Sequence, residues 1–448
     1  GIHYRGLEQL NLWLSQAEDH LTINSTHAGT THIDGNGGND RFDVNDLNGL
    51  TTLHGDAGDD NFNIRRTSAA LTIVGHADND TVHVGSDAPT LGSHVNNIAA
   101  TITFTGSGGS DRLIVDDRTD SAVSTATLTS TAVSGMGAGV VTYDTLEDVE
   151  LYFGSGADTL TIESTHQNNN RVEMNSGNDT VHAESINGPS ILHGDAGEDT
   201  FNVQQTTAVT TIHTGADNDT VNVGSVAPSM GGVLDQIGAA LILHGEAGSD
   251  NLVVDDTLED TNNLADVTER LITGMDLHSD GIQYETFEDL LLEMGTKDDT
   301  LNIASTHAGT STFRLHDGDD TLNAAQLGGI TTIEGGNDAD TFNIQRISSS
   351  TTVSGNQGID NFNVGTTAPA VGGSLDQIDG ALTLDGNAGN DILVIDDSSD
   401  TDDNSGTLTD TSADPGTLIG LEMHTDGINY DNFTDLTLHL GTGNDHLT

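Results

Sequence analysis

An aspartate recurs along this chain at an almost fixed interval, each time after a turn of small residues and before an alternating apolar stretch. Successive steps within a group are 21, 20, 20 and 31 residues, as from Asp19 to Asp111. A fixed period in this range is typical of a solenoid, in which each repeat is one supersecondary unit stacked on the next. The positions are Asp19, Asp40, Asp60, Asp80, Asp111, Asp158, Asp179, Asp199, Asp219, Asp250, Asp299, Asp320, Asp340, Asp360, Asp391 and Asp445.

The group of five steps itself repeats. It restarts after 139, 141 and 146 residues (158 − 19, 299 − 158 and 445 − 299). We therefore predict about three large repeats of about 140 residues, each of several rungs. The predicted boundaries are 1–150, 151–291 and 292–437, and 438–448 is predicted to begin a fourth repeat.

The composition excludes several classes of protein. The 448 residues include 71 Asp and Glu but only 11 Lys and Arg, and the net charge is −60. This charge rules out nucleic acid as a partner and disfavours anionic lipid, because both require clustered basic residues. There is no cysteine, hence no thiolate site, and no apolar run long enough to insert into a membrane. Disorder is common in acidic chains, but here the charges are spaced and separated by regular apolar alternation.

One coil can be followed through residues 55–74. Residues 55–60 form a Gly-rich turn that ends in Asp60, and residues 61–64 alternate polar and apolar as a half-buried strand does. A polar corner at 65–68 precedes a second strand at 70–74. Two strands and two corners in about 20 residues predict an all-β fold, a parallel β-solenoid shaped as a flattened β-roll with rungs about 4.8 Å apart. The asparagines that recur in the first strand are expected to form a solvated ladder.

Two coils of each large repeat are irregular. The 31-residue step carries an insertion beginning Ala-Pro, at 88–92, 227–231 and 368–372. The strands after it, 113–115, 252–254 and 393–395, are apolar on both faces, so we expect the insertion, as a helix or loop, or a neighbouring molecule to cover them. The long step before each new group is expected to hold two rungs, one without an acidic turn.

The turns favour calcium. Calcium takes six to eight oxygen ligands from carboxylates and carbonyls, at about 2.3–2.6 Å. A Gly-rich turn exposes carbonyls, its Asp adds a carboxylate, and the next turn completes the cage. Without metal, neighbouring aspartates about 4.8 Å apart would repel one another. We predict calcium ions in a row along one edge, and a fold that depends on them. The candidate ligands are Asp40, Asp60, Asp80, Asp111, Asp158, Asp179, Asp199, Asp219, Asp250, Asp299, Asp320, Asp340, Asp360, Asp391 and Asp445.

Six turns carry a motif that resembles the G-G-x-G-x-D-x-U-x repeat of RTX calcium-binding proteins. They are residues 35–40, 55–60, 106–111, 194–199, 245–250 and 386–391. The resemblance implies a right-handed parallel β-roll with calcium in its turns, secreted unfolded and folding in calcium-rich surroundings. The spacing departs from that family's repeat of about nine residues, which suggests a single metal edge.

Two departures concern the turn itself. Asp78, Asp217 and Asp338 replace the fourth-position glycine, and Asp tolerates the left-handed conformation better than most residues. The turn before Asp19 has no glycine, so this is the weakest predicted site.

Enzyme readings find little support in the residues. Ser-Thr-His recurs at 25–27, 164–166 and 305–307, too far apart for copies to assemble a triad, and a structural role is expected. The other histidines, among them His76, His83, His193 and His213, lack zinc-enzyme spacing. A polysaccharide-acting β-helix enzyme would need a unique basic or aromatic cluster, whereas the basic residues here are scattered.

The expected function is an extracellular, calcium-stabilised structural rod that forms the shaft of a surface filament or the stalk of a large adhesin. Its expected partners are calcium and copies of itself or further repeats, because both ends lie inside the repeating pattern. The alternative is a solenoid face that binds ice or carbohydrate through regular Thr and Asn ladders.

Overall fold

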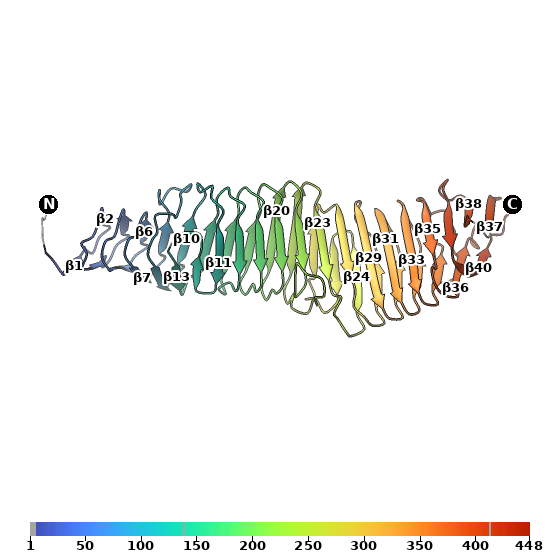
Figure 1. Cartoon of the computed structure of the whole chain (residues 1–448), viewed down its shortest axis with the longest axis horizontal. Coiled ribbons are helices and arrows are strands. Elements are labelled where there is room, and N and C mark those ends of the chain that lie inside the picture. Colours follow the sequence, from blue (N-terminus) through green and yellow to red (C-terminus); the bar gives the residue numbers. More distant parts are fainter. Residues whose placement is uncertain (1–5, 138, 412–413) are drawn as a thin grey trace. The chain divides into compact units, whose positions relative to one another are not determined.

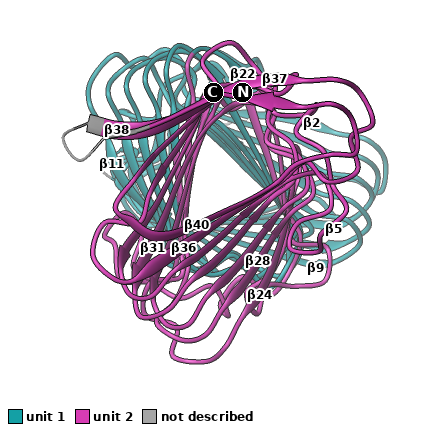
Figure 2. Cartoon of the chain, turned by 90° about the vertical axis from the view of Figure 1, so that its right-hand side faces the viewer, with its two compact units in different colours: residues 1–220, 246–248 teal, residues 221–245, 249–448 magenta. Residues whose placement is uncertain are grey.

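The computed structural model describes residues 6–137, 139–411 and 414–448, and every regular element among them is a β-strand (Figure 1). The chain divides into two compact units, unit 1 (residues 1–220 and 246–248) and unit 2 (221–245 and 249–448), shown in Figure 2. Within each unit the strands form two sheets, called A and B here. No described segment is a helix of the length and apolarity that would cross a bilayer.

Unit 1 contains the strands up to β20, and β21 (Thr220–Val223) lies where the units meet in sequence. Neighbours in sheet A are, in order, β1 (Gln9–Trp13), β3 (Thr30–Asp34), β5 (Thr51–Ala57), β7 (Leu71–Ala77), β9 (Ile102–Gly108), β13 (Val141–Asp144), β12 (Ala132–Ser134), β11 (Thr125–Thr129), β15 (Thr159–Ile162), β17 (Thr180–Ala183) and β19 (Thr200–Val203). Sheet B contains β2 (His20–Ile23), β4 (Arg41–Val44), β6 (Asn61–Ile64), β8 (Thr81–Val84), β10 (Arg112–Asp116), β14 (Asp148–Tyr152), β16 (Asn169–Glu173), β18 (Ser190–His193) and β20 (Thr210–Ala216).

Unit 2 is built in the same way. Sheet A contains β23 (Asn251–Asp255), β27 (Asp289–Glu293), β29 (Thr310–Asp317), β31 (Ile330–Asn337), β33 (Thr351–Gln357), β35 (Leu382–Asp385), β39 (Ile428–Asp431), β38 (Asp414–Gly420), β37 (Ser405–Thr411) and β41 (His446–Leu447). Sheet B contains β22 (Leu241–Ala247), β26 (Ile282–Glu285), β25 (Leu271–Gly274), β24 (Leu264–Thr268), β28 (Thr300–Ile303), β30 (Thr321–Ala324), β32 (Thr341–Ile344), β34 (Asn361–Val364), β36 (Asp391–Asp396) and β40 (Phe433–His439).

Each regular rung places one strand in each sheet and pairs it in parallel with the same strand of the next rung. Phe42 lies opposite Phe62, for example, and their rings stack with centroids 4.8 Å apart. Both phenylalanines are fully buried, because every second residue of a strand points into the core. The predicted all-β parallel solenoid with rungs of about 20 residues is confirmed. The predicted boundaries of the large repeats and the handedness stay predictions.

The long steps contain a strand reversal that the sequence did not indicate. In unit 1, β12 pairs antiparallel with both β11 and β13, while β11 and β13 pair in parallel with β15 and β9. Strands β25 and β38 of unit 2 are antiparallel in the same way. The buried Tyr143 donates its hydroxyl to the carbonyl of Thr129 at 2.6 Å, which ties β13 to the end of β11.

The reversal changes the edge on which the acidic turns lie. In unit 1, Asp111 follows β9 of sheet A and precedes β10 of sheet B, but Asp158 follows β14 of sheet B and precedes β15 of sheet A. The chain runs from β10 through three strands of sheet A to β14, which amounts to one and a half rungs. The same exchange separates Asp250, before β23 of sheet A, from Asp299, before β28 of sheet B, in unit 2.

The insertions of the 31-residue steps are loops without helix. Their backbone is held at the end of the following strand: Asp116 Oδ2 accepts the N–H groups of Gly92 and Ser93 at 2.8 and 3.0 Å. The outward middle residue of the apolar strand is buried in one copy (Ile114) and half-buried in the others (Val253, Val394).

Candidate metal centre

The acidic turn is the six-residue segment that ends in each recurring aspartate. All the predicted ligands except Asp445, which is half-buried, are at most 2% exposed. They therefore face the interior edge of the solenoid rather than solvent. A charged group is kept at such a position only when it is hydrogen-bonded, paired or bound to a metal.

One oxygen of each carboxylate has a fixed structural role. The backbone N–H of Asp40 donates to Asp60 Oδ1 at 2.7 Å, and the N–H of Asp60 donates to Asp80 Oδ1 at 2.9 Å. Bonds of 2.6–3.0 Å join the rest of these rows, between residues 19 and 111, 158 and 219, and 299 and 391. The side chain of one rung thus satisfies the backbone of its neighbour at a turn where no sheet hydrogen bond is possible.

The rows end at the long steps. Asp111 donates its N–H to Glu147 Oε2, and Asp250 donates to Glu288 Oε2, so a glutamate closes each of these rows. The prediction of one row along one edge is therefore wrong: within unit 1, the row from Asp40 to Asp111 and the row from Asp158 to Asp219 lie on opposite edges. Unit 2 divides its aspartates between both edges in the same manner.

The second carboxylate oxygen is buried without a hydrogen-bond partner among the described residues. This is the case for Oδ2 of Asp40, Asp60, Asp80, Asp111, Asp158, Asp179, Asp199, Asp320, Asp340, Asp360 and Asp391. The recurrence of the same orphaned oxygen means that its surroundings are built for a group that is not a protein donor.

The first residue of the turn, commonly glycine, makes room for this oxygen. A Cβ on Gly55 would lie 2.2 Å from Asp60 Oδ2 and 3.0 Å from the carbonyl oxygen of Gly75 in the next turn. At Gly355 the corresponding distances are 2.2 Å to Asp360 Oδ2 and 3.1 Å to the Gly386 carbonyl oxygen. Carboxylate and carbonyl oxygens of successive turns therefore border the same small space.

The fourth residue of the turn brings successive turns close together. Gly58 has φ of 121°, and a Cβ there would lie 2.4 Å from the carbonyl oxygen of Gly38. Where aspartate replaces this glycine, as at Asp78, Asp217 and Asp338, φ is 72–84° and the turn survives as predicted. Asp78 Oδ2 also accepts the N–H of Gly58 at 3.1 Å.

The fifth residue forms an outer ladder that the sequence analysis missed. The N–H of Asp59 donates to Asn39 Oδ1 at 3.1 Å, and the N–H of Asn79 donates to Asp59 Oδ1 at 2.9 Å. This exposed ladder runs opposite in direction to the buried one. The interchange of Asn and Asp at this position was the available signal, because either side chain offers the acceptor oxygen that is required.

Burial raises the pKa of the ladder carboxyls. The pKa rises to about 7 for Asp60, Asp179 and Asp320. It rises to about 8 for Asp80, Asp199 and Asp340. Desolvation is the largest cause; the backbone N–H bond opposes it, and neighbouring carboxylates add to it. Without a counter-cation the fold favours protonated carboxyls near neutral pH.

The donor set fits calcium. The orphaned Oδ2 atoms and the nearby glycine carbonyls are hard oxygens, and neither nitrogen nor sulfur is among the atoms that border this space in these turns. The residues that would hold an ion are the turn aspartates together with the backbone of the first turn residue of the following rung. A bound divalent cation would supply the positive charge that these carboxylates lack.

A second set of buried carboxylates was also missed. An Asp-Asp pair follows each apolar strand, at 116–117, 255–256 and 396–397, and the recurrence of this pair was the signal. The first aspartate anchors the insertion: Asp255 Oδ2 accepts the N–H of Gly232 at 2.6 Å, as Asp116 does in its own copy. Burial raises the pKa of Asp256 to about 8.

The Ser-Thr-His tripeptides have the structural role that was expected. Thr165 Oγ1 accepts the N–H groups of Asn187 and Gly188 at 2.8 and 3.1 Å, which caps the corner of the next rung. Thr26 and Thr306 make the equivalent bonds.

No protein-family model and no curated protein matches the sequence. Among solved structures, the chain is similar to a hyperactive, Ca2+-dependent, β-helical antifreeze protein from an Antarctic bacterium. The two are 17% identical, the match covers 77% of this chain and 86% of that chain, and the TM-score is 0.21. With so low a TM-score the two structures do not superpose over their length, so no property of that protein is transferred to this chain.

Proposed function

We propose that this chain is a calcium-dependent structural segment of an extracellular repeat protein. The observation that supports this most directly is the rows of buried aspartates, each with one oxygen bonded to the neighbouring rung and one oxygen without a donor. Calcium between the turns neutralises these carboxylates and joins successive rungs, so binding free energy becomes folding free energy.

A structural role follows from where the carboxylates lie. Buried groups repeated in every rung cannot each meet a substrate, whereas they can each stabilise the rung above and below. Extracellular fluid is the setting that suits such sites, since weak calcium sites fill at the concentrations found there. A shaft of a filament or the stalk of an adhesin is the role we propose, with further repeats or copies of the chain as partners.

Chelation tests calcium dependence. We expect excess chelator to convert the β-rich circular dichroism signal of the full chain to a largely disordered one, and added calcium to restore it. Proteolytic resistance should fall and recover in parallel. An unchanged spectrum and unchanged resistance in chelator would contradict the proposal.

A second candidate is a face that binds an ordered surface such as ice. The observation that favours it is a threonine row in register across sheet A of unit 2, Thr312, Thr332, Thr352 and Thr383. The Asn ladder of sheet B is less suited, because Asn343 Nδ2 bonds Asn323 Oδ1 at 2.8 Å and Asn343 is only 3% exposed.

Thermal hysteresis of the calcium-loaded chain separates the two roles. Ice binding predicts a freezing gap that Thr352→Tyr reduces while the circular dichroism spectrum is unchanged. A purely structural segment predicts no gap with either protein.

A further inference from the structure

Three histidines climb the outward face of sheet A in unit 1. His32 lies on β3, His54 on β5 and His76 on β7, and each is half-buried. They are 22 residues apart, two more than the rung, so each one is displaced along the strand relative to the last. Two aspartates fill the intervening places, because Asp34 is paired in register with His54 and Asp56 with His76.

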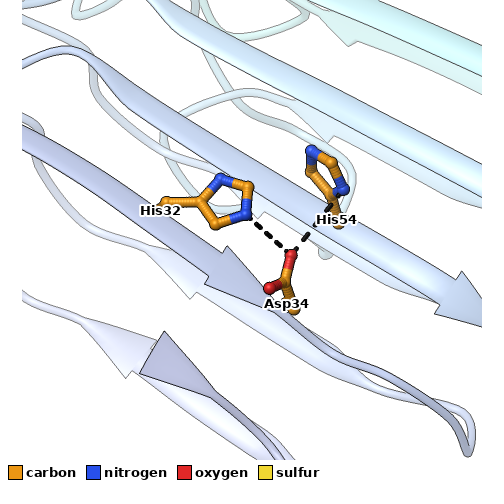
Figure 3. Close-up of side chains that lie close together, drawn as sticks. All are labelled: His32, Asp34 and His54. Carbon is orange, nitrogen blue, oxygen red and sulfur yellow. Dashed lines mark ion pairs between the residues drawn. The ribbon is translucent and has the colours of Figure 1, made fainter. Parts of the chain in front are cut away.

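The side chains of this His–Asp staircase (His32, Asp34, His54, Asp56 and His76) converge. Asp34 Oδ1 is 2.9 Å from His32 Nε2 and 3.7 Å from His54 Nδ1, and Figure 3 shows the two rings directed at this carboxylate. His76 Nε2 is 3.1 Å from His54 Nδ1 and 3.6 Å from Asp56 Oδ1. Within each of the two overlapping triads, one ligand atom per residue lies within 4.8 Å of the others.

The histidine nitrogens are available to a metal. Burial, and then the neighbouring rings of His32 and His76, lower the pKa of His54, so its ring is neutral at neutral pH. The side chains stay accessible, with 35%, 26% and 40% exposure for His32, His54 and His76. Neutral imidazole with a carboxylate is a ligand set typical of zinc and its neighbours, and distinct from the all-oxygen sets of calcium.

The chain provides its own comparison 139 residues further on. There the residue matching Asp34 is Glu173, which already has Arg171 at 2.6 Å and Arg118 at 2.9 Å. His193, which matches His54, stacks on His213 with centroids 4.7 Å apart. Asp34 has ion pairs with His32 and His54 alone among the described residues. The staircase has ligands where its counterpart has guanidinium groups.

We propose that the His–Asp staircase binds one divalent transition-metal ion of the zinc class. His54 is the shared ligand of the two triads, and since both use its Nδ1, only one ion binds at a time. His32 with Asp34, or His76 with Asp56, completes three protein ligands. The outward face leaves a fourth position to water, and small side-chain rotations shorten the distances to the coordination range of about 2.0–2.2 Å.

Zinc titration of the full, calcium-saturated chain tests the site. Excess calcium occupies the oxygen sites, so calorimetry should show one zinc ion per chain. His54→Gln should weaken zinc binding at least about tenfold, as loss of a ligand or its support does. The matched control, His193→Gln, should bind zinc as the unaltered chain does.

Two results would overturn the proposal: no zinc binding that survives excess calcium, or equal zinc affinity in His54→Gln and the unaltered chain. Circular dichroism in calcium verifies that each variant folds. If His54→Gln does not fold, the double variant His32→Gln/His76→Gln decides, because it leaves each triad with a single histidine and the same two outcomes apply.

Discussion

At the scale of single residues, the recurring aspartate performs two tasks with its two oxygens. Asp199 Oδ1 accepts the N–H of Asp179 at 2.8 Å, while Asp199 Oδ2 is buried without a donor among the described residues. An amide could perform the first task, since its oxygen also accepts a hydrogen bond. Only a carboxylate supplies the charge for the second, which explains why asparagine occupies the outer ladder but not the inner one.

Substitutions at Asp199 should separate these tasks. In calcium, Asp199→Asn is expected to raise the calcium concentration at the folding midpoint, because a charged ligand is lost. Asp199→Ala should cost about a further 1–3 kcal/mol, since the N–H of Asp179 then has no acceptor. Urea unfolding in calcium measures both, and equal stabilities of the two variants would show that the hydrogen bond contributes nothing.

Asp59→Asn is the matched control for this pair. Asp59 lies one position before Asp60 in the outer ladder, where Asn39 and Asn79 precede and follow it. Asparagine there retains the acceptor, so calcium midpoint and stability should stay close to those of the unaltered chain.

Acidification should partly replace calcium. The pKa of Asp80, Asp199 and Asp340 is about 8 in the folded chain and about 3.9 in an unfolded one. Because the folded pKa is the higher, their contribution to stability is complete below pH ~4 and is lost as pH rises through about 8. In chelator, β-structure should therefore increase as pH falls from 8 to 6, as measured by circular dichroism. A calcium-free chain that loses structure over this range would contradict the raised pKa values.

At the scale of the element, the acidic turn depends on backbones that nearly touch. Gly58 combines a left-handed φ of 121° with a Cβ position 2.4 Å from a backbone oxygen that cannot move aside. Gly108, in the third position of another turn, has a Cβ position 3.5 Å from the nearest atom, which is ordinary contact. Two glycines of one motif thus have different requirements.

Alanine substitutions should reveal this difference. Gly58→Ala is expected to destabilise the chain by more than about 1–2 kcal/mol, the cost of the left-handed conformation alone, because the clash adds to it. Gly108→Ala should be nearly neutral. Thermal unfolding in calcium compares them, and similar melting temperatures would show that the turns can separate without cost.

At the scale of the whole molecule, charge decides whether the chain folds. A net charge of −60 with buried carboxylates in both units opposes compaction, and monovalent salt screens exposed charges far better than buried ones. The cation must therefore enter the turns rather than surround the protein.

Cation selectivity follows from this requirement. After chelation, calcium should restore the β-rich spectrum, while magnesium or potassium chloride at equal ionic strength should restore little of it. Calcium accepts irregular sets of six to eight oxygens, whereas magnesium demands octahedral geometry and retains its water. Equal recovery with potassium chloride would show that screening alone is sufficient.

The sequence by itself determined the rung and the turn chemistry. A period of 20 residues fixes which residues stack, and alternation around Phe62 and Phe342 fixes which face is buried, because both are local properties of a strand. The candidate aspartates followed from that period alone, and the structure places 14 of the 15 in buried positions.

Tertiary structure decided the rest, because it depends on which strand edges meet. The antiparallel strands β12, β25 and β38 resemble any short strand in sequence, yet their reversal moves the acidic turns of each unit to the opposite edge. The separate use of Oδ1 and Oδ2 depends on the exact height of one turn over the next. His32, His54 and His76 show no metal spacing along the chain, since a 22-residue step brings histidines together only after the rungs have stacked.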